Sequence, residues 1–451
     1  MTTRLANAYP RKHFFLEMFT RDISLEDCIL DLIDNSIDGL VRTRKLDISS
    51  VILQENTMAA TSKKANLLQI DISYSETHFE IKDNCGGIRR KDALEDVFNF
   101  GHAPGVTGGT LGVYGIGLKR AIFKLGEVFD MKSQTIEDGF AVVKLNVKEW
   151  AEKDDDLEDW KIPLVFTGGA DSEKHAGTTI KITKLRPEVV MRIKDGVLEQ
   201  KLRSVISRTY ALFIGRYVSI TLNGKEIVGF EIPLGKSNEV EPAYDIFEDD
   251  GVKIELFASL AIRKEQEWKA ETAGWYVLCN GRVVVAADKT ELTGWGAGSL
   301  PQFHSKFRGF IGVAFFRSKD PMSLPWTTSK RGLNQESRVY QNARNRMRGI
   351  ARPIITFLDS VYKTEMPEDS AGRTIANAVK PVSLSQISLK PATVFAVHPA
   401  SRSVPTKVSI QFSAEKANVE TIRKHLKAYS WGANRIGEHT FNHFLKTECP
   451  E

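Results

Sequence analysis

Apolar positions in residues 24–40, SLEDCILDLIDNSIDGL, recur at the spacing of a helix with one buried face. Following the i, i+3, i+4, i+7 series, the apolar or small residues stand at positions 25, 28, 29, 32, 33, 36, 37 and 40. Ser24 followed three residues later by Asp27 resembles a capping box and predicts where the helix begins. Because Gly39 lies where such a helix would end, we expect an amphipathic helix that closes near this glycine.

An alternating pattern after this helix predicts the start of a sheet. In residues 66–84, NLLQIDISYSETHFEIKDN, apolar side chains alternate with polar ones in two runs, which is typical of a hairpin. Further strand-like runs occur at 140–147, 178–183 and 217–222, and helical runs lie after Leu118 and near 197–214. Together these elements predict a mixed α/β domain, which we assign to residues 1–240.

The β pattern restarts after an acidic, turn-rich stretch at 236–251. Three strand candidates, VKIELFASLAI, WYVLCNGRVVVAA and FRGFIGVAFF, precede a helix near 337–362 and predict a second domain over residues 241–365. Residues 366–405 are rich in Pro, Ser and Ala with little periodicity, which is typical of a linker. A small C-terminal α/β segment, 406–451, is expected to hold one strand, VSIQF, and two short helices.

Composition and charge narrow the class of protein. With 451 residues, 42% of them hydrophobic and 26% charged, the chain has the balance of a globular protein of about three domains. No stretch approaches about 18 uncharged apolar residues, and the N-terminus has no apolar segment, so we expect no membrane span, no secretory signal and a cytoplasmic location. The four cysteines are widely spaced and predict free thiols. A net charge of +5 does not by itself indicate a nucleic-acid partner.

A polar stripe on the first predicted helix is a candidate binding surface. Asp31, Asn35 and Asp38 stand at i, i+4 and i+7, so they project within roughly 40° of one another. A solvated helix face is the ordinary alternative. The asparagine at the centre favours a site instead, since its neutral oxygen can bind Mg²⁺ beside a carboxylate that orients water.

Two further motifs contain groups suited to a nucleotide. Asp83 in DNCGGI follows a strand and precedes a glycine-permitted tight turn, where its carboxylate can accept a hydrogen bond from an exocyclic amine or simply belong to a structural turn. Residues 101–117 contain seven glycines and predict a loop. Its end, GVYGIGLKRA, places glycines before a helix start, where backbone N–H groups can hold phosphate, although it matches neither a Walker loop nor a dinucleotide fingerprint.

The order and spacing of these motifs resemble the GHKL ATPase superfamily, which includes gyrase B subunits, MutL, the large heat-shock chaperones, histidine kinases and MORC proteins. DLIDNSIDGL is similar to the family's ExxxNxxDA helix, DNCGGI to its DNGxG turn, GVYGIGLKRA to its GxxGxGxKS loop and HAGTT to its GT strand. The resemblance covers roughly residues 15–225. It implies the Bergerat fold, a two-layer α/β sandwich with a mixed sheet and helices on one face.

The same resemblance implies a role for each motif residue. Asp31 would be the general base, Asn35 the ligand of Mg²⁺, and Asp83 the acceptor of the adenine amino group, with Thr178 supporting Asp83 through water. The other implied ATP-binding residues are Asp38, Gly87, Tyr114, Gly115, Ile116, Gly117, Leu118 and Lys119. Residues 89–111 would form the lid over the nucleotide.

Two departures from the family pattern bear on activity. Asp31 stands where the family has Glu, and the shorter side chain moves the carboxylate by about 1 Å, a displacement that can cost about 100-fold in rate. Slow hydrolysis is therefore expected, unless the helix lies closer to the nucleotide. Cys85 replaces the first glycine of the DNGxG turn, so the turn is expected to survive with altered backbone angles.

The second half resembles one branch of the superfamily. WYVLCNGRVV, residues 275–284, is similar to the strand-turn-strand of the ribosomal-protein-like transducer domain in gyrase, MutL and MORC proteins. That domain carries a lysine that reaches the γ-phosphate. LPWTTSKRGLN offers Lys330 for this role, with Arg331 as the alternative, in a loop most similar to those of MORC proteins. A solvated lysine is the ordinary interpretation.

Basic residues gather after this loop. Arg344, Arg348 and Arg352 fall on one i, i+4 stripe. They are either a solvated helix face or a salt-dependent contact with the phosphate backbone of DNA or RNA.

Together the resemblances imply a slow, Mg²⁺-dependent ATPase that closes an N-terminal homodimer as a clamp. The chain would act on DNA or a DNA-associated protein partner, in DNA maintenance or foreign-DNA defence, with closest likeness to prokaryotic MORC-like proteins. The N-terminal arm, residues 8–19, is a candidate for exchange between protomers, and packing on its own domain is equally open. The alternatives are a nucleotide-regulated scaffold with little hydrolysis and a chaperone of the heat-shock type.

Overall fold

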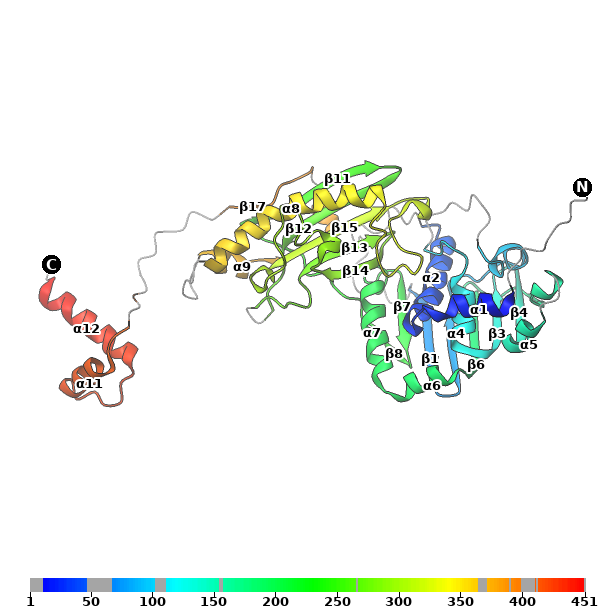
Figure 1. Ribbon diagram of the computed structural model, residues 1–451, viewed down its shortest axis with the longest axis horizontal. Helices are drawn as coiled ribbons and strands as arrows, with labels where there is room; N and C mark the ends of the chain where they lie inside the picture. Colours follow the sequence, from blue (N-terminus) through cyan, green and yellow to red (C-terminus); the bar gives the residue numbers. More distant parts are fainter. Residues whose placement is uncertain are drawn as a thin grey trace, which may run out of the picture. The chain divides into compact units, whose positions relative to one another are not determined.

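The computed structural model describes residues 11–46, 67–101, 111–153, 157–264, 267–363, 371–388, 391–398, 410 and 413–449. The chain divides into two compact units, residues 1–399 and residues 400–451. Figure 1 shows the elements in sequence colours.

The first part of the larger unit is built on an eight-stranded sheet with the order β5-β4-β3-β6-β2-β1-β7-β8. Neighbouring strands are antiparallel except β1 and β7, whose pairing is parallel, so the sheet is mixed. The strands are β1 (Leu68–Tyr74), β2 (His78–Asp83), β3 (Gly126–Gln134), β4 (Asp138–Asn146), β5 (Val165–Gly168), β6 (Gly177–Leu185), β7 (Val218–Leu222) and β8 (Lys225–Glu226). The predicted hairpin of β1 and β2 is confirmed, with Ile70 opposite Asp83.

Helices cover one face of this sheet. Figure 1 shows α1 (Lys12–Arg21), α2 (Leu25–Thr43) and α4 (Gly117–Leu125) together on that side, and α2 packs against α4. Alternation in β1 places Leu68, Ile70 and Ile72 in the core. The opposite face carries exposed side chains such as Val143. The chain therefore has the mixed α/β sandwich architecture expected of a Bergerat fold.

The helix predicted over residues 24–40 forms as α2, but its end differs from the prediction. Ser24 accepts a hydrogen bond from the Asp27 N–H at 3.1 Å, which confirms the N-terminal cap. The helix continues to Thr43 instead of closing at Gly39. A Cβ at Gly39 would lie 2.8 Å from the carbonyl oxygen of Cys85, so this glycine permits close packing of the turn after β2.

Several strands were not predicted, and the longest of them are β3 and β11. β3 lies at the centre of the first sheet, between β4 and β6, and alternates buried residues with polar ones in a segment that the pattern left unassigned. β11 (Ala243–Asp249) lies within the acidic stretch that predicted only turns. Its acidic side chains face cations of a later helix, since Arg346 pairs with Asp245 at 3.1 Å and Arg338 with Asp249 at 3.7 Å.

A second, five-stranded sheet follows in the same unit, with the order β11-β12-β15-β13-β14. Its other strands are β12 (Val252–Leu260), β13 (Gly274–Cys279), β14 (Arg282–Asp288) and β15 (Phe310–Arg317). The long helix α8 (Arg338–Lys363) packs on β11, β12 and β15 (Figure 1). Every residue of β13 and β15 is buried, and these strands belong to the same continuous hydrophobic core as the first sheet.

Part of the segment with linker composition is structured. Two short antiparallel pairings attach it, β16 (Lys380–Pro381) to β9 (Gly235–Lys236) and β17 (Ala396–Val397) to β10 (Val240–Glu241). Its helices α9 (Ala371–Asn377) and α10 (Leu384–Ser388) contribute Ile375 and Ile387 to the core. Periodicity was weak because these elements are short.

Apart from α7, which has 13 residues, the remaining helical elements of the larger unit are short. They are α3 (Arg90–Asp92), the π-helix η2 (Ala93–Val97), α5 (Val147–Glu152), η3 (Leu157–Trp160), α6 (Pro187–Lys194), α7 (Val197–Thr209), η4 (Glu291–Thr293), η5 (Ser305–Phe307) and η6 (Pro321–Ser323).

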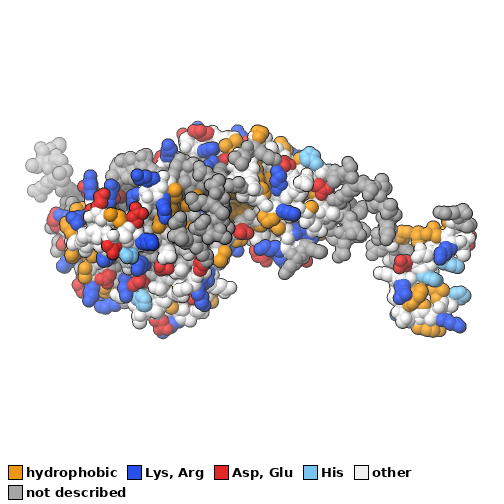
Figure 2. Space-filling view, turned by 180° about the vertical axis from the view of Figure 1, so that it is seen from behind, with side chains coloured by type: hydrophobic (Ala, Val, Ile, Leu, Met, Phe, Trp, Pro, Cys, Tyr) orange, Lys and Arg blue, Asp and Glu red, His pale blue; other side chains and the backbone are white. Residues whose placement is uncertain are grey.

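The smaller unit consists, within residues 413–449, of two helices, α11 (Lys416–His425) and α12 (Ala433–Glu448). Figure 2 shows hydrophobic side chains on its surface, and Phe441, Phe444 and Leu445 are among the exposed ones. The strand predicted at 408–412 lies outside the described residues except for Ile410.

The cysteines and the membrane prediction can also be compared with the structure. All four cysteines are free, and Cys28, Cys85 and Cys279 are buried. Among the described residues, no helix has both the length and the apolar character needed to cross a bilayer.

Candidate functional site

A cavity of about 680 Å³ opens between α2, the turn after β2, the glycine loop before α4 and a loop of the second sheet. Segments far apart in the sequence meet there. The predicted site residues on its wall are Asp31, Asn35, Asp38, Asp83, Gly87, Tyr114, Gly115, Ile116, Gly117, Leu118, Lys119, Thr178 and Lys330. The structure therefore brings the whole predicted set to one cavity, while the role of each residue stays a prediction.

At one end of the cavity Asp83 is held by three donors. Its Oδ1 accepts from the backbone N–H of Cys85 at 2.9 Å and of Thr178 at 3.2 Å, and its Oδ2 accepts from the Ser36 hydroxyl at 2.8 Å. Burial raises the pKa of Asp83, and these hydrogen bonds oppose the shift. Thr178 therefore contacts Asp83 directly through its backbone, whereas the sequence analysis expected a water between them.

Ser36 was not among the predicted residues. It follows Asn35 directly on α2, and the small residue that the helical pattern assigned to the buried face in fact donates to the carboxylate at the end of β2. The only signal in the sequence was a hydroxyl at a position expected to be buried.

The turn after Asp83 keeps its shape with cysteine in the first glycine position. The left-handed backbone angles fall on Gly86, with φ +92°, and Gly87, with φ +67°. A Cβ at Gly87 would lie 2.1 Å from the carbonyl oxygen of Gln134. Cys85 is not among the residues with positive φ, so an L-residue is accommodated there without backbone strain.

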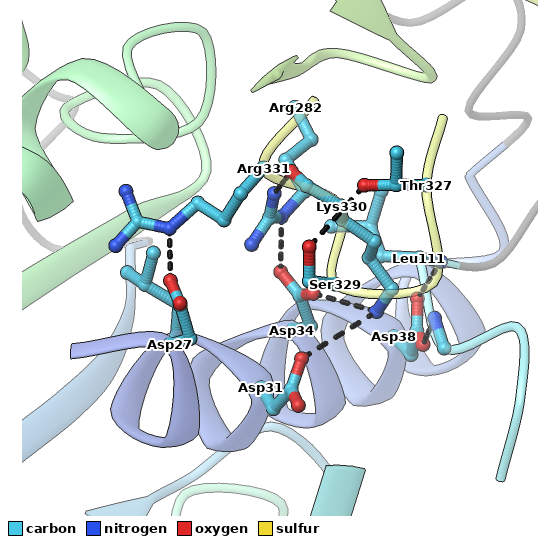
Figure 3. Close-up of polar contacts among 12 residues, drawn as sticks. Asp27, Asp31, Asp34, Asp38, Leu111, Arg282, Thr327, Ser329, Lys330 and Arg331 are labelled. Carbon is cyan, nitrogen blue, oxygen red and sulfur yellow. Dashed lines mark hydrogen bonds and ion pairs between the residues drawn. The ribbon is translucent and has the colours of Figure 1, made fainter. Parts of the chain in front are cut away.

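At the other end, α2 contributes two carboxylates and an amide. Asn35 is exposed in a helix whose neighbouring residues are buried, and it lines the cavity. Asp38 accepts hydrogen bonds from the backbone N–H groups of Leu111 and Gly112, both at 2.6 Å (Figure 3). Burial raises the pKa of Asp38 to about 6, and the two backbone hydrogen bonds oppose the shift. Asp38 therefore fixes the end of the glycine loop.

Asp31 is a buried carboxylate beside the start of α4. Burial raises its pKa to about 6, the nearby Lys330 cation lowers it, and the Asp34 carboxylate raises it. A group with this pKa is charged at neutral pH and is close to the range that suits a general base.

Lys119 extends from the first turn of α4 toward the segment predicted as the lid. Its Nζ donates to the carbonyl oxygen of Val97 at 2.8 Å and lies 5.7 Å from the ring centroid of Phe100. Burial lowers the pKa of Lys119 to about 8, and the Asp96 charge opposes the shift. Of the predicted lid, residues 102–110 lie outside the described residues.

Lys330 enters the cavity from the loop between β15 and α8. Its Nζ donates to Asp34 Oδ2 at 2.8 Å and lies 4.0 Å from Asp31 Oδ1 (Figure 3). Arg331, the alternative cation, instead forms an ion pair with Asp27 near the start of α2. Of the two candidates, only Lys330 lines the cavity.

Three buried residues behind Lys330 were not predicted. Asp34 accepts hydrogen bonds from Arg282 and from the Tyr210 hydroxyl as well as from Lys330. Burial alone would raise the pKa of Asp34, but the Arg282 and Lys330 cations overcome this effect and lower it. The signal that could have found this cluster is Arg282, a charge placed next to the apolar run VVVAA.

The arginine stripe of α8 is partly packed into the protein. Arg348 lies against a glycine-rich loop, where a Cβ at Gly294 would meet its Cγ at 2.7 Å. Arg344 is half-buried as well, and Arg352 is exposed. Two neighbours in the basic cluster, Arg338 and Arg346, are paired with the acidic residues of β11. The stripe therefore presents one exposed arginine and two that are partly covered.

One comparison matches part of the chain to a known family. Residues 23–165 match the family model described as histidine kinase-, DNA gyrase B-, and HSP90-like ATPase. This segment contains α2, the Asp83 turn and the glycine loop, and ends before Thr178 and Lys330. A search of curated proteins found none that matches the chain. Over residues 23–165 the chain is therefore similar to GHKL-type ATPases, which supports ATP binding in this part of the chain.

Proposed function

We propose that this protein binds Mg²⁺-ATP in the cavity between α2 and α4 and hydrolyses it slowly. The observation that carries the proposal is the convergence of four separated segments on one cavity inside and beside the matched region. The volume, about 680 Å³, lies within the usual range of small-molecule sites.

The purine would lie at the Asp83 end. The donors that surround this carboxylate fix its orientation, so a remaining lone pair can accept a hydrogen bond from the exocyclic amine of adenine. Because Asp83 and its donors are mostly backbone or α2 groups, the recognition is built on rigid elements.

The phosphates would lie between α2 and the start of α4. Glycine amides at the N-terminus of α4 and the Lys119 ammonium supply positive charge, and Asn35 offers the amide oxygen that a magnesium ion can bind. The fit of the metal rests on Asn35, whose side chain is exposed at the cavity although the residues on either side of it are buried. When bound, Mg²⁺ would offset phosphate charge, and ATP would supply the bond to be cleaved.

Asp31 is the proposed base, and Lys330 the proposed cation near the γ-phosphate. Asp31 would orient the attacking water, and the shorter side chain is the reason to expect slow turnover. Lys330 comes from the second sheet, which we assign to a transducer domain, and its charge would stabilise the transferring phosphoryl group.

We further propose an ATP-dependent homodimer that acts as a clamp on DNA or a DNA-associated partner, as in MORC-like relatives. Phe14 and Met18 of α1 are 59% and 58% exposed one helical turn apart, which gives a second copy an apolar surface near the lid. For DNA the support is the exposed Arg352 on α8 together with the resemblance of the two domains.

Binding is tested first. Direct titration with Mg²⁺-ATP should give a measurable Kd that Asn35→Ala and Asp83→Ala each weaken at least about tenfold, a loss of about 1.4 kcal/mol. Asp71→Asn, which changes an exposed carboxylate on the neighbouring strand β1, is the matched control and should bind normally. Equal binding by all four proteins would refute the proposed site.

Turnover separates an ATPase from a nucleotide-regulated scaffold, the alternative that the aspartate in place of glutamate favours. If the wild type and Asp31→Asn bind ATP equally and hydrolyse it at the same background rate, the scaffold is correct. A rate that depends on Asp31 and on magnesium supports the ATPase.

A further inference from the structure

The carboxylate of Asp34 is fully buried and is shared by three parts of the fold. It accepts from the Tyr210 hydroxyl after α7 at 2.7 Å. It also accepts from Arg282 Nε at the start of β14 at 3.0 Å and from Lys330 Nζ at 2.8 Å (Figure 3). Its exposed fraction is 0%. Burying a carboxylate is costly, and a buried ion pair seldom adds stability over apolar packing, so this cluster calls for a role besides folding.

Arg282 contacts both the backbone of Lys330 and Asp34, the carboxylate that pairs with the Lys330 side chain. While Nε donates to Asp34, the other nitrogen, Nη1, donates to the carbonyl oxygen of Lys330 at 2.5 Å. One guanidinium thus fixes the backbone of Lys330 and the carboxylate that its ammonium contacts. The planar fork of arginine suits this double contact, which lysine cannot reproduce.

The loop itself is closed by its own backbone. Lys330 N–H donates to the Thr327 carbonyl at 2.8 Å, and Thr327 N–H donates to the Gly332 carbonyl at 3.0 Å. Lys330 has a φ of +55°, a left-handed conformation that costs free energy and needs surrounding contacts to persist. The hydrogen bond from Arg282 to the Lys330 carbonyl oxygen is one such contact.

Neither Asp34 nor Arg282 lines the cavity, whereas Lys330 and Asp31 do. The buried pair therefore contacts the cavity through Lys330, while the charges of Asp34 and Arg282 also act on the pKa of Asp31. An ammonium has three N–H donors, so Lys330 can keep its hydrogen bond to Asp34 and still offer donors to a phosphate. Lys330 Nζ already lies 4.0 Å from Asp31 Oδ1, at the limit of an ion pair, and without Asp34 this carboxylate would be its nearest partner, so the cation would move onto the base.

We propose that Asp34 and Arg282 are positioning residues, which hold Lys330 against α2 so that its cation points to the phosphate end of the cavity and leaves Asp31 available. This inference rests on the proposed ATPase function. In this proposal the contacts of Asp34 with Arg282 and Lys330 hold the second sheet against α2 and make it a fixed part of the site.

Arg282→Lys is the first test. This variant keeps a positive charge for Asp34 but loses the second nitrogen that holds the Lys330 carbonyl. We expect the Kd for Mg²⁺-ATP to stay within about twofold, while single-turnover hydrolysis slows by about tenfold or more, the size of effect that a small misplacement produces. Arg192→Lys is the matched control. Arg192, on α6, pairs at 2.6 Å with Glu26, which lies on α2 like Asp34, and it does not contact Lys330. The turnover of this variant should equal that of the wild type.

A double-mutant cycle tests whether the effect passes through Lys330. In a Lys330→Met background, Arg282→Lys should slow single-turnover hydrolysis no further, because the group that it positions is gone. Losses that multiply would show that Arg282 acts by another route and would overturn the proposal. Thermal unfolding of each variant shows whether it folds. If Arg282→Lys does not fold, Tyr210→Phe, which removes one neutral donor to Asp34, takes its place in the same cycle.

Different results would contradict the proposed function and the positioning role. A wild type that neither binds nor hydrolyses ATP contradicts the proposed function. A wild type that hydrolyses ATP while Arg282→Lys and Tyr210→Phe both match Arg192→Lys contradicts only the positioning role.

Discussion

The backbone of Gly117 lies directly against the side chain of Asp31. A Cβ at Gly117 would come within 2.9 Å of Asp31 Cβ and 3.0 Å of its Cγ. The start of α4 therefore approaches the candidate base as closely as a glycine permits.

Gly117→Ala should disrupt this approach. The new methyl group must displace Asp31 or the first turn of α4, so we expect a loss of about 1–3 kcal/mol in the free energy of unfolding and roughly 100-fold slower hydrolysis. Gly349→Ala is the control, because nothing lies within 4 Å of a Cβ at that position of α8. It should leave turnover unchanged, and equal turnover by both variants would contradict the prediction.

Asp31→Asn should stop hydrolysis while making the protein more stable at neutral pH. Burial raises the pKa of Asp31 from 3.8 to about 6, so the folded state binds this proton more tightly than the unfolded chain. That contribution to stability is present below about pH 4 and is lost as pH rises through about 6. Asparagine carries no charge to desolvate, so denaturant unfolding at pH 7 should show a gain of about 3 kcal/mol. A variant less stable than the wild type at pH 7 would contradict the desolvation argument.

The pH profile of turnover should report the pKa of Asp31. Hydrolysis is expected to fall as pH drops through about 6, where the base becomes protonated. Because the Lys330 cation lowers the pKa of Asp31, Lys330→Met should move this acid limb to higher pH in the residual activity. Arg331→Met changes the neighbouring cation, which pairs with Asp27, and should leave the limb in place. A shift of the same size in both variants would assign the limb to another group.

Affinity for ATP should weaken at alkaline pH. Burial lowers the pKa of Lys119 to about 8, so above that pH the side chain loses the charge that attracts phosphate. Binding measured at pH 7 and pH 9 should therefore differ for the wild type and not for Lys119→Met, whose Kd should already be weaker at pH 7. Parallel pH dependence in the two proteins would rule out Lys119 as the cause.

DNA retention, if present, should depend more on Arg352 than on the rest of the basic cluster. Arg352 is exposed, whereas Arg338 and Arg346 are paired with acidic residues of β11. Arg352→Ala should weaken DNA binding at all sequences and reduce the slope against log salt by about one. Arg338→Ala is the control, and a larger effect from it than from Arg352→Ala would place the contact elsewhere.

Local sequence patterns predicted the parts of the fold that local spacing determines. The α2 helix with its Ser24 cap and the β1–β2 hairpin follow from periodicity. β3 was missed because half of its positions are polar, and β11 because its carboxylates are neutralised by α8, which lies about 90 residues later in the sequence. The end of α2 was predicted wrongly because Gly39 permits close packing against Cys85 and does not mark the end of the helix.

In the candidate site as well, local motifs were predicted and contacts between distant segments were not. Asp31, Asn35, Asp83 and the glycine loop were found from spacing and resemblance, since each motif is continuous in the chain. Asp34 and Arg282 are 248 positions apart, and only the docking of the second sheet brings them together. A buried contact of that kind has no periodic signature, although an arginine beside a run of valines is a sign that some partner exists.

The contact between Gly39 and Cys85 ties the helix that carries Asn35 and Asp38 to the turn after Asp83. In the motifs that these segments resemble, the helix has alanine and the turn begins with glycine, whereas this chain has glycine on the helix and cysteine in the turn. A methyl group at position 39 would lie 2.8 Å from the carbonyl oxygen of Cys85 and 3.3 Å from its Cβ, so alanine there would require the turn to move whichever side chain stands at position 85. An adenine mimic in the cavity would meet the sulfur of Cys85, which lines it, but burial raises the pKa of this thiol and makes it a poor nucleophile.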